Sequence, residues 1–296
     1  MAGVRDALPA TFAEFQAAYP TEQACADYLE KLRWPGEFVC PKCGTSAAPW
    51  HLGKPGVLKC SMCRADLSLM ADSVMRGSHT ELTTWFGGAY ILVAQAPTPS
   101  VRQFQRKLGI KRYETAYALL QKLRAPMLQP EKERIGGDCS VDIGAVVVTT
   151  RWKRPSVQEV CVLGALETSP PGRLRLQAVE ERDVVTCVRF AQEHVAPLSA
   201  VRTDGWSGYS GMKKSGYVHA VMSDAALLLP KGVSDLQSWL DSSRRGRSVP
   251  LPNSLNEYVF RFNGRGRQMA SFNRVLGLGA PPLPPAEITS NEAGGA

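Results

Sequence analysis

Two pairs of cysteines have the spacing that proteins use to bind zinc. Cys40 and Cys43 form one CxxC pair, Cys60 and Cys63 form another, and sixteen residues separate the two pairs. Each pair can fold into a tight knuckle that directs two sulfur atoms at one tetrahedral ion, which predicts a zinc ribbon. Because four thiolates close the coordination sphere, we expect this zinc to be structural. Four unligated cysteines are the alternative, and His51 is either a substitute ligand or an exposed or packed side chain.

Two aspartates lie on predicted strands, where a carboxylate needs a cationic partner. Asp142 is inside an apolar strand, and Asp204 ends a short strand before Gly205, which lets the chain turn. An unpaired carboxylate is costly in a buried strand. Two such carboxylates side by side repel each other, and Mg²⁺ relieves that repulsion, as in two-metal phosphoryl-transfer sites. The alternative for either aspartate alone is a turn or cap residue.

Helices and short strands are predicted around the cysteine pairs. Thr11 to Leu32 has apolar residues at three- and four-residue spacings, which predicts a helical lead-in that Trp34-Pro35-Gly36 ends. Between the pairs, apolar residues alternate with turn formers, as in hairpin strands. This segment has too little apolar surface to fold without metal. After it, the apolar run from Leu82 to Gln95 predicts a buried helix.

Residues 100–124 contain two short helical patterns that meet at Leu108-Gly109-Ile110. Ser100 can cap the first helix, and Gly109 permits the turn. An apolar stripe follows both helices, which predicts a helix-turn-helix whose second helix enters the major groove of DNA. The candidates for base contacts lie at the leading end of that helix and are Lys111, Arg112, Tyr113 and Thr115. A plain helical hairpin with a solvated basic face is the alternative.

The positive charge of the chain is concentrated in two windows. The formal net charge is +8, with nine Lys and Arg against three Glu from Pro97 to Arg134, and seven Arg against two acids from Asp241 to Arg274. Concentrated basic patches attract a polyanion such as nucleic acid more strongly than diffuse charge does. A basic solvated surface is the alternative. The composition, with 44% hydrophobic residues, excludes wholesale disorder.

Beyond Gln129 the pattern changes from helical to strand-like. Three β-rich runs, residues 139–150, 157–167 and 173–180, are separated by Pro and Gly and predict an antiparallel start to a sheet. Asp183 to His194 then has a helical pattern, and Ala200 to Thr203 predicts a short strand. Strands followed by alternating helix and strand give an α/β fold class.

The order of these motifs resembles the zinc-ribbon DDE-type insertion-sequence transposases over roughly residues 12 to 265. The shared motifs are FVCPKCG (38–44), LKCSMC (58–63), a Trp-containing apolar helix, a helix-turn-helix, VD in a first strand, TDGWSGY (203–209) and LNEYVFRFN (255–263). The resemblance implies an RNase-H-like fold in which Asp142 and Asp204 are the first two Mg²⁺ ligands. We also expect residues 256–263 to form a helix packed against the sheet, with Arg261 and the following Arg265 and Arg267 directed toward DNA phosphates.

The sequence departs from that family at two places. Family members continue the first aspartate with Glu and a Tyr-Gly-Gly-like loop, whereas Asp142 is followed by Ile143-Gly144-Ala145-Val146. The third catalytic position aligns with Ser234, with Asp235 next to it and Asp241 near the place of the family lysine. Asp235 is therefore the substitute that we expect for the third member.

The resemblance divides the chain into five parts. They are a helical lead-in (1–36), a zinc ribbon (37–78), a helical helix-turn-helix region (79–134), an RNase-H-like catalytic-type domain (135–278) and a disordered tail (279–296).

No apolar signal core begins the chain, and its longest apolar stretch is too short to cross a membrane. We therefore expect a cytoplasmic, nucleoid-associated bacterial protein.

Three functions are compatible with these motifs. The first is a transposase that binds double-stranded DNA at the ends of its element, as a homo-oligomer, and cuts and joins strands with Mg²⁺. The second keeps this architecture without catalysis, as a transposase-derived, sequence-specific DNA-binding protein. The third, a transcription-associated zinc-ribbon factor, leaves TDGWSGY and NEYVFRFN unexplained.

Overall fold

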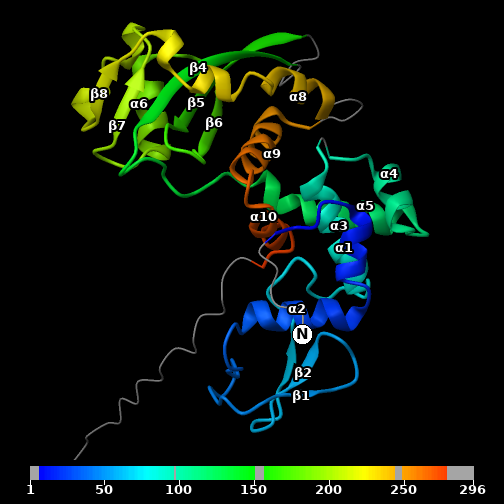
Figure 1. Cartoon of the computed structure of the whole chain (residues 1–296). Coiled ribbons are helices and arrows are strands. Elements are labelled where there is room, and N and C mark those ends of the chain that lie inside the picture. Colours follow the sequence, from blue (N-terminus) through cyan, green and yellow to red (C-terminus); the bar gives the residue numbers. More distant parts are fainter. Residues whose placement is uncertain (1–6, 97, 151–156, 244–248, 279–296) are drawn as a thin grey trace, which may run out of the picture. The chain divides into compact units, whose positions relative to one another are not determined.

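A computed structural model describes residues 7–96, 98–150, 157–243 and 249–278 (Figure 1). The predicted tail (279–296) and Arg244, Arg245 and Arg247 of the second basic window lie outside these residues. The chain forms two compact units. Unit 1 comprises Met1–Ala94, Ser100–Leu123 and Phe272–Ala296, and unit 2 comprises Gln95–Pro99 and Arg124–Ser271.

Unit 1 begins with two helices where the sequence pattern predicted one continuous run. α1 (Phe12–Ala18) starts at a capping box in which the Thr11 side chain accepts from the Glu14 amide, and α2 (Glu22–Arg33) starts at a second N-cap, Thr21. The chain breaks at Tyr19-Pro20 because proline fits the start of a new helix better than the interior of an old one. Aromatic rings of Phe15, Tyr19, Tyr28, Phe86 and Phe272 pack together in the core of this unit.

Three further helices of unit 1 follow, and the second and third of them occupy the two helical patterns predicted within residues 100–124. They are α3 (Leu82–Ala94), α4 (Val101–Leu108) and α5 (Tyr113–Arg124), of which α5 ends at the boundary with unit 2. Ser100 caps α4 in a capping box with Gln103, and Gly109 adopts a left-handed φ of 64° that ends it. A Cβ atom at Gly88 would lie 2.8 Å from Leu123 and 2.9 Å from Phe104, so this glycine permits the helices to approach closely.

Unit 2 is built on a five-stranded mixed sheet with the order β6-β5-β4-β7-β8. The strands are β4 (Val141–Thr150), β5 (Gln158–Glu167), β6 (Leu174–Val179), β7 (Ala200–Thr203) and β8 (Val218–Val221). β4, β5 and β6 are antiparallel neighbours, whereas β7 pairs with β4 and β8 with β7 in parallel. This arrangement confirms the α/β class and the RNase-H-like mixed sheet.

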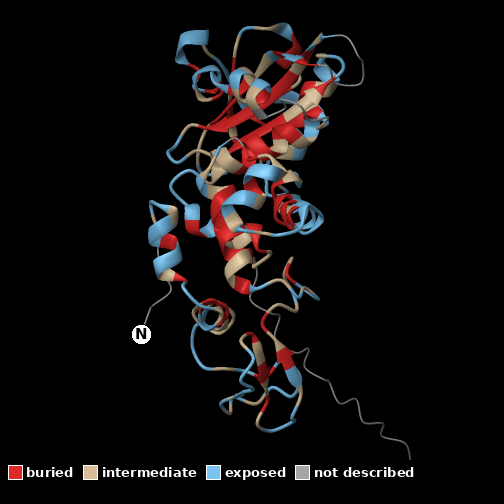
Figure 2. Ribbon diagram, turned by 90° about the vertical axis from the view of Figure 1, so that its right-hand side faces the viewer, coloured by how far each residue is buried: buried red, intermediate tan, exposed pale blue. Residues whose placement is uncertain are grey.

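Helices cover both faces of this sheet, and the central strands between them are largely buried (Figure 2). α6 (Val184–His194) packs against one face with Val141 and Ile143 of β4. α7 (Leu229–Gly232), α8 (Leu236–Ser243) and α9 (Leu251–Asn263) pack against the other face with Val146 and Val148. Since side chains alternate along a strand, Asp142 points to the α7 side of the sheet.

Short elements connect or follow these strands and helices. They are four 3₁₀ turns, η1 (Ala125–Leu128), η2 (Ser207–Tyr209), η3 (Lys213–Ser215) and η4 (Asp224–Ala226), and the helix α10 (Gln268–Val275). Among the described residues no helix has the length and apolar character needed to cross a membrane.

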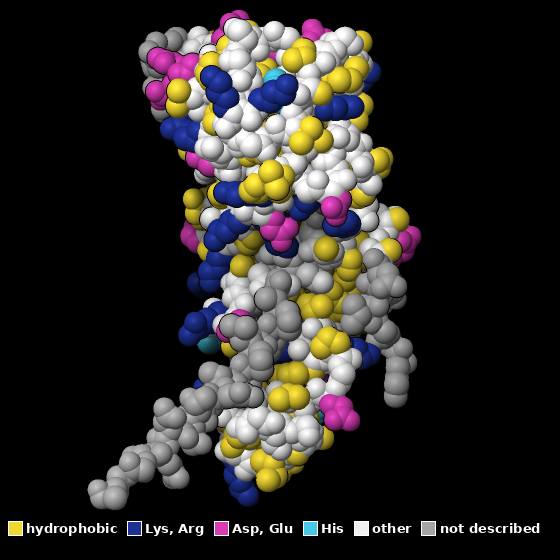
Figure 3. Space-filling view, turned by 90° about the vertical axis from the view of Figure 1, so that its left-hand side faces the viewer, with side chains coloured by type: hydrophobic (Ala, Val, Ile, Leu, Met, Phe, Trp, Pro, Cys, Tyr) yellow, Lys and Arg dark blue, Asp and Glu magenta, His cyan; other side chains and the backbone are white. Residues whose placement is uncertain are grey.

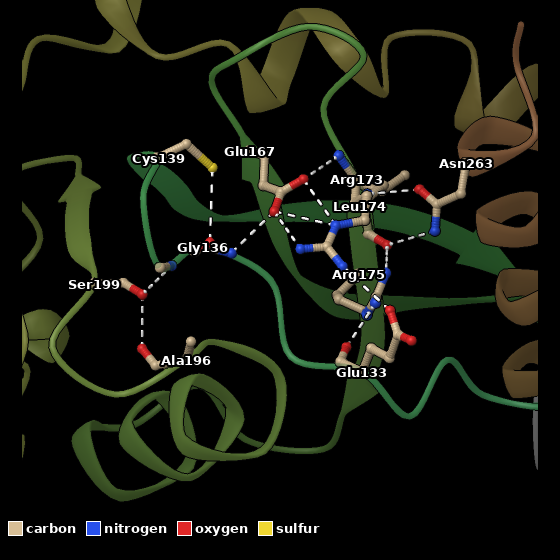
Figure 4. A network of polar contacts seen from close by, with 11 residues as sticks. Glu133, Gly136, Cys139, Glu167, Arg173, Leu174, Arg175, Ala196, Ser199 and Asn263 are labelled. Atoms are coloured by element: carbon tan, nitrogen blue, oxygen red, sulfur yellow. Dashed lines mark hydrogen bonds and ion pairs between the residues drawn. The ribbon is translucent and has the colours of Figure 1, made fainter.

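A hydrogen-bond network fastens the end of β5 to the segment before β4 (Figure 4). The Glu167 carboxylate accepts from the backbone amides of Gly136 (3.0 Å) and Arg173 (2.9 Å) and from the Arg173 guanidinium (2.8 Å). Beside it, the side-chain amide of Asn263 bonds both backbone groups of Leu174. Asn263 therefore ties the end of α9 to β6.

The Glu167 network should make stability depend on acid pH. Burial alone would raise the pKa of Glu167, but its hydrogen bonds to Arg173 and Gly136 outweigh burial and lower the pKa from 4.5 to about 2. A lowered carboxyl pKa contributes stability that is present above 4.5 and is lost as pH falls toward about 2. We expect the unfolding free energy of the wild type to fall more steeply over this window than that of Glu167→Gln. Equal slopes for the two proteins would contradict this assignment.

Candidate functional site

The four cysteines of the predicted ribbon converge in unit 1. Their ligand sulfurs all lie within 4.8 Å of one another, with Cys40 and Cys63 3.8 Å apart and Cys43 and Cys60 3.7 Å apart. Zinc–sulfur bonds of about 2.3 Å in a tetrahedron place sulfur atoms about 3.8 Å apart, so the cluster fits one zinc ion. His51 is not a member, because its ring bonds the Glu30 carboxylate at 3.0 Å.

Two knuckles of the same geometry hold these sulfurs. The amide of Gly44 donates to the Cys40 carbonyl at 2.9 Å, and the amide of Arg64 donates to the Cys60 carbonyl at 3.0 Å. Both donors have left-handed backbone, with φ of 72° at Gly44 and 60° at Arg64. A three-stranded antiparallel sheet, β1 (Trp50–His51), β2 (Val57–Lys59) and β3 (Asp66–Ser68), joins the knuckles. The predicted hairpin is confirmed, with β3 as an additional strand.

The predicted base-contact residues all lie on the exposed surface at the start of α5. Lys111 and Arg112 precede the helix, and Tyr113 and Thr115 are in its first turn. Tyr113 is 44% exposed and stacks on Tyr117, which is 49% exposed, with ring centroids 6.4 Å apart. On the opposite side, Ala116, Leu119, Leu120 and Leu123 are buried. α5 therefore presents a basic and aromatic face to solvent.

The three predicted phosphate-contacting arginines have different surroundings in unit 2. Arg265 and Arg267 are exposed, and the Arg265 guanidinium lies over the Phe262 ring. Arg261 differs from the prediction: its side chain is 12% exposed and donates to Glu257, Thr98 and the Gln95 carbonyl. The guanidinium N–H groups of Arg261 are therefore hydrogen-bonded within the protein. Figure 3 shows that Lys and Arg side chains on the visible face form several separate groups.

Asp142 is fully buried and both of its carboxylate oxygens have partners. Oδ1 accepts from Arg202 Nε at 2.6 Å, and Oδ2 accepts from the Leu228 amide at 2.5 Å. The parallel register of β4 and β7 places Arg202 directly opposite Asp142. The Arg202 side chain is 25% exposed, and its hydrogen bond to Asp142 raises the pKa of the guanidinium.

Asp204 directly follows β7 and is more accessible than Asp142. Its Oδ1 accepts from the Trp206 amide at 2.9 Å, which shapes the turn, and its Oδ2 lies 3.5 Å from Arg182. The Arg182 guanidinium lies 3.9 Å from the Trp206 ring centroid and donates to the Tyr209 hydroxyl. The motif TDGWSGY therefore positions both Asp204 and the arginine beside it.

Strand register brings the two aspartates to neighbouring positions, although their partners differ. Asp142 pairs with Arg202, and Asp204 is two residues farther along the same strand direction. Parallel strand spacing and rise then place the two Cα atoms roughly 8 Å apart. Magnesium in proteins takes one or two carboxylates together with water and substrate phosphate oxygens. The carboxylates nevertheless have different surroundings. Asp142 bonds Arg202 and the Leu228 amide on the α7 side of the sheet, whereas Asp204 lies against Arg182, which packs on Trp206 of the α6-side core.

Asp235, the expected third member, does not join the two aspartates. Its carboxylate accepts from the Tyr258 hydroxyl at 2.5 Å and lies 3.9 Å from Arg265. Within the described part of the chain, the thiolate cluster is the only set of three or more Cys, His, Asp or Glu ligands that converges. α8 packs near the other end of β4, since Gln237 bonds the Thr149 backbone.

Two family models match the chain. Residues 20–66 match the transposase zinc-ribbon domain, and residues 143–225 match the ISXO2-like transposase domain. The first match contains the four cysteines, and the second contains Asp204 and begins one residue after Asp142. No curated protein matches the chain. Both matches are to transposase domains, in agreement with the resemblance of the motifs.

Sequence reasoning missed several residues that shape these sites. Tyr117 lies four residues after Tyr113, a helical spacing that identifies it as a neighbour on α5. Arg202 lies opposite Asp142 in the parallel register of β4 and β7, which no local pattern in the sequence gives. Arg182 carries no such local signal, because α6 and a loop separate it from Asp204 in the sequence.

Proposed function

We propose that this protein is a DNA transposase. Its ribbon and helix-turn-helix bind the ends of an element, and Asp142 and Asp204 serve Mg²⁺-dependent cutting and joining of strands, with paired subunits on two ends. The observation that carries the proposal is the placement of Asp204 after β7, beside the strand that bears Asp142, within a matched transposase domain.

The two units divide this work between binding and chemistry. In unit 1, Lys111 and Arg112 are placed to contact phosphates or base edges, and the exposed Tyr113 offers an apolar surface to a thymine methyl group. In unit 2, the Asp204 carboxylate is open to one side and is held by the Trp206 amide. When bound there, Mg²⁺ supplies activation of the attacking oxygen and stabilisation of the leaving oxygen. Arg182, fixed on Trp206, keeps the carboxylate oriented.

Incubation with Mg²⁺ or Mn²⁺ and DNA carrying the repeats that flank the gene tests this proposal. We expect nicks with the wild type and a cutting rate at least about 100-fold lower with Asp204→Asn, because the amide still accepts from Trp206 but is a poor ligand. Binding, followed by gel shift, should be unchanged in Asp204→Asn. In Lys111→Ala/Arg112→Ala it should weaken by about tenfold or more.

Glu193→Gln is the matched control, because Glu193 is an exposed acid on α6, and it should bind and cut as the wild type does. Cutting retained by Asp204→Asn would remove Asp204 from the site. Tight binding without any cutting by the wild type would leave a transposase-derived DNA-binding protein.

A further inference from the structure

The exposed surface of α4 and α5 carries one acid among many cations. Its exposed cations are Arg102, Arg106, Lys107, Lys111, Arg112 and Lys122. Glu114, in the first turn of α5, is the only Asp or Glu of residues 100–124, and it is exposed. Among the residues that the structure describes, Glu114 has no ion-pair partner. A negative charge therefore lies within the surface that is otherwise most suited to a polyanion.

Glu114 is directed away from the buried side of α5. The buried side chains of this helix include Ala116, Leu119, Leu120 and Leu123. At 3.6 residues per turn, Glu114, Ala118 and Gln121 lie opposite the middle of that buried stripe, and all three are exposed. A duplex that binds along this face of α5 therefore meets the Glu114 carboxylate together with the cations.

A carboxylate that faces DNA opposes binding unless a donor on the DNA bonds it. Phosphates repel it, so Glu114 weakens every contact that depends on the backbone alone. In the major groove, the exocyclic amine of cytosine is a donor, and Asp and Glu are the side chains that accept from it. The alternative is that Glu114 only stabilises the start of α5 through the helix dipole, which would leave base preference unaffected.

We propose that Glu114 is a specificity-determining residue that accepts a hydrogen bond from the exocyclic amine of a cytosine in duplex DNA. This inference rests on the proposed function, because it takes α5 as the helix that enters the major groove. Glu114 repels phosphates at every site and gains a hydrogen bond only where a cytosine faces it. It therefore increases discrimination by weakening binding to other sequences.

Selection of sites from a random duplex library by the zinc-loaded, full-length protein tests this role. In the sites that the wild type enriches, we expect one position at which cytosine is preferred by about tenfold. Glu114→Ala should lose the preference at that position alone. Glu114→Gln should change it to adenine, because a side-chain amide pairs with N6 and N7 of adenine.

Affinity for a duplex of random sequence gives a second measure, with a gain instead of a loss. Removal of the carboxylate should tighten this binding by roughly two- to fivefold in both Glu114 variants. Lys122→Ala is the matched control, because it removes an exposed charge from the same helix. It should weaken binding to all duplexes about equally and leave the base preferences unchanged.

Base preferences that are the same in the wild type and both Glu114 variants would overturn the proposal, and so would a wild type that enriches no sequence. A lower unfolding temperature of the variants with unchanged preferences would assign Glu114 to the helix start alone. Strand cutting judges the proposed function separately. A protein that shows the change from cytosine to adenine but cuts no DNA refutes the transposase and retains this inference. Cutting without that change does the opposite.

Discussion

Replacement of Cys60 by serine is expected to remove the zinc ion and unfold the ribbon. The buried apolar side chains in and beside its three strands are few, chiefly Leu58, Leu67 and Leu69, so the metal must supply most of the folding free energy. Structural zinc sites contribute about 10 to 16 kcal/mol of apparent binding free energy near neutral pH. Loss of one of four thiolates should therefore remove stoichiometric zinc, measured by metal analysis of the purified protein.

Cys139→Ser provides the control for this experiment. Cys139 lies in unit 2, whereas the thiolate cluster lies in unit 1, and its sulfur makes a long contact of 4.0 Å with the Gly136 carbonyl. This variant should keep one zinc per chain. Proteolysis within residues 37–69 should be fast in Cys60→Ser and in chelator-treated wild type, and slow in Cys139→Ser. A Cys60→Ser protein that retains one zinc per chain would contradict the four-thiolate assignment.

Glu257→Gln is expected to destabilise unit 2 by about 3 to 5 kcal/mol, the usual cost of breaking a buried ion pair by removing one partner. Glu257 is 0% exposed and lies between Arg124, which donates at 2.5 Å, and Arg261. It also accepts a short hydrogen bond from Thr98. Without the carboxylate, two buried guanidinium groups would repel each other. Chemical denaturation of the variant and the wild type measures the difference.

Protonation of Glu257 should make the stability contribution of this network depend on pH. Burial alone would raise the pKa of Glu257, but attraction to Arg124 and Arg261 outweighs it and lowers the pKa. Its contribution is therefore present at neutral pH and is lost as pH falls through the lowered pKa. Glu193→Gln, at an exposed position, should change stability by no more than about 0.5 kcal/mol. If Glu257→Gln also lost no more than about 0.5 kcal/mol, the network would not be a stabilising ion pair.

The sequence predicted most elements because their signals are local. Ser100 and Gly109 define the ends of α4 through a side-chain cap and a left-handed turn, and both act within a few residues. Ala200–Thr203 was predicted with the bounds that the structure shows. The break between α1 and α2 was missed because the apolar spacing continues across Tyr19-Pro20, although Thr21 is a typical N-cap.

The partners of the buried charges could not be predicted, because they depend on strand register and tertiary packing. Arg124 and Glu257 are 133 residues apart in the chain, and nothing near either residue identifies the other. For that reason Arg261 was expected to contact phosphate, whereas the structure shows it bound to Glu257. The family resemblance predicted Asp142 and Asp204 as metal ligands, but the Arg202 bond to Asp142 depends on how β4 and β7 align.

The central strand of the large sheet has unequal connections to its two neighbours. β4 pairs with β5 through ten residues but with β7 through two, Val141 with Val201 and Asp142 with Arg202. The two aspartates therefore belong to β4 and to the end of β7, the neighbouring strands of this sheet that pair over the fewest residues. A small hinge movement of β7 and β8 about this pairing would change the carboxylate spacing and leave the hairpin of β4 and β5 intact.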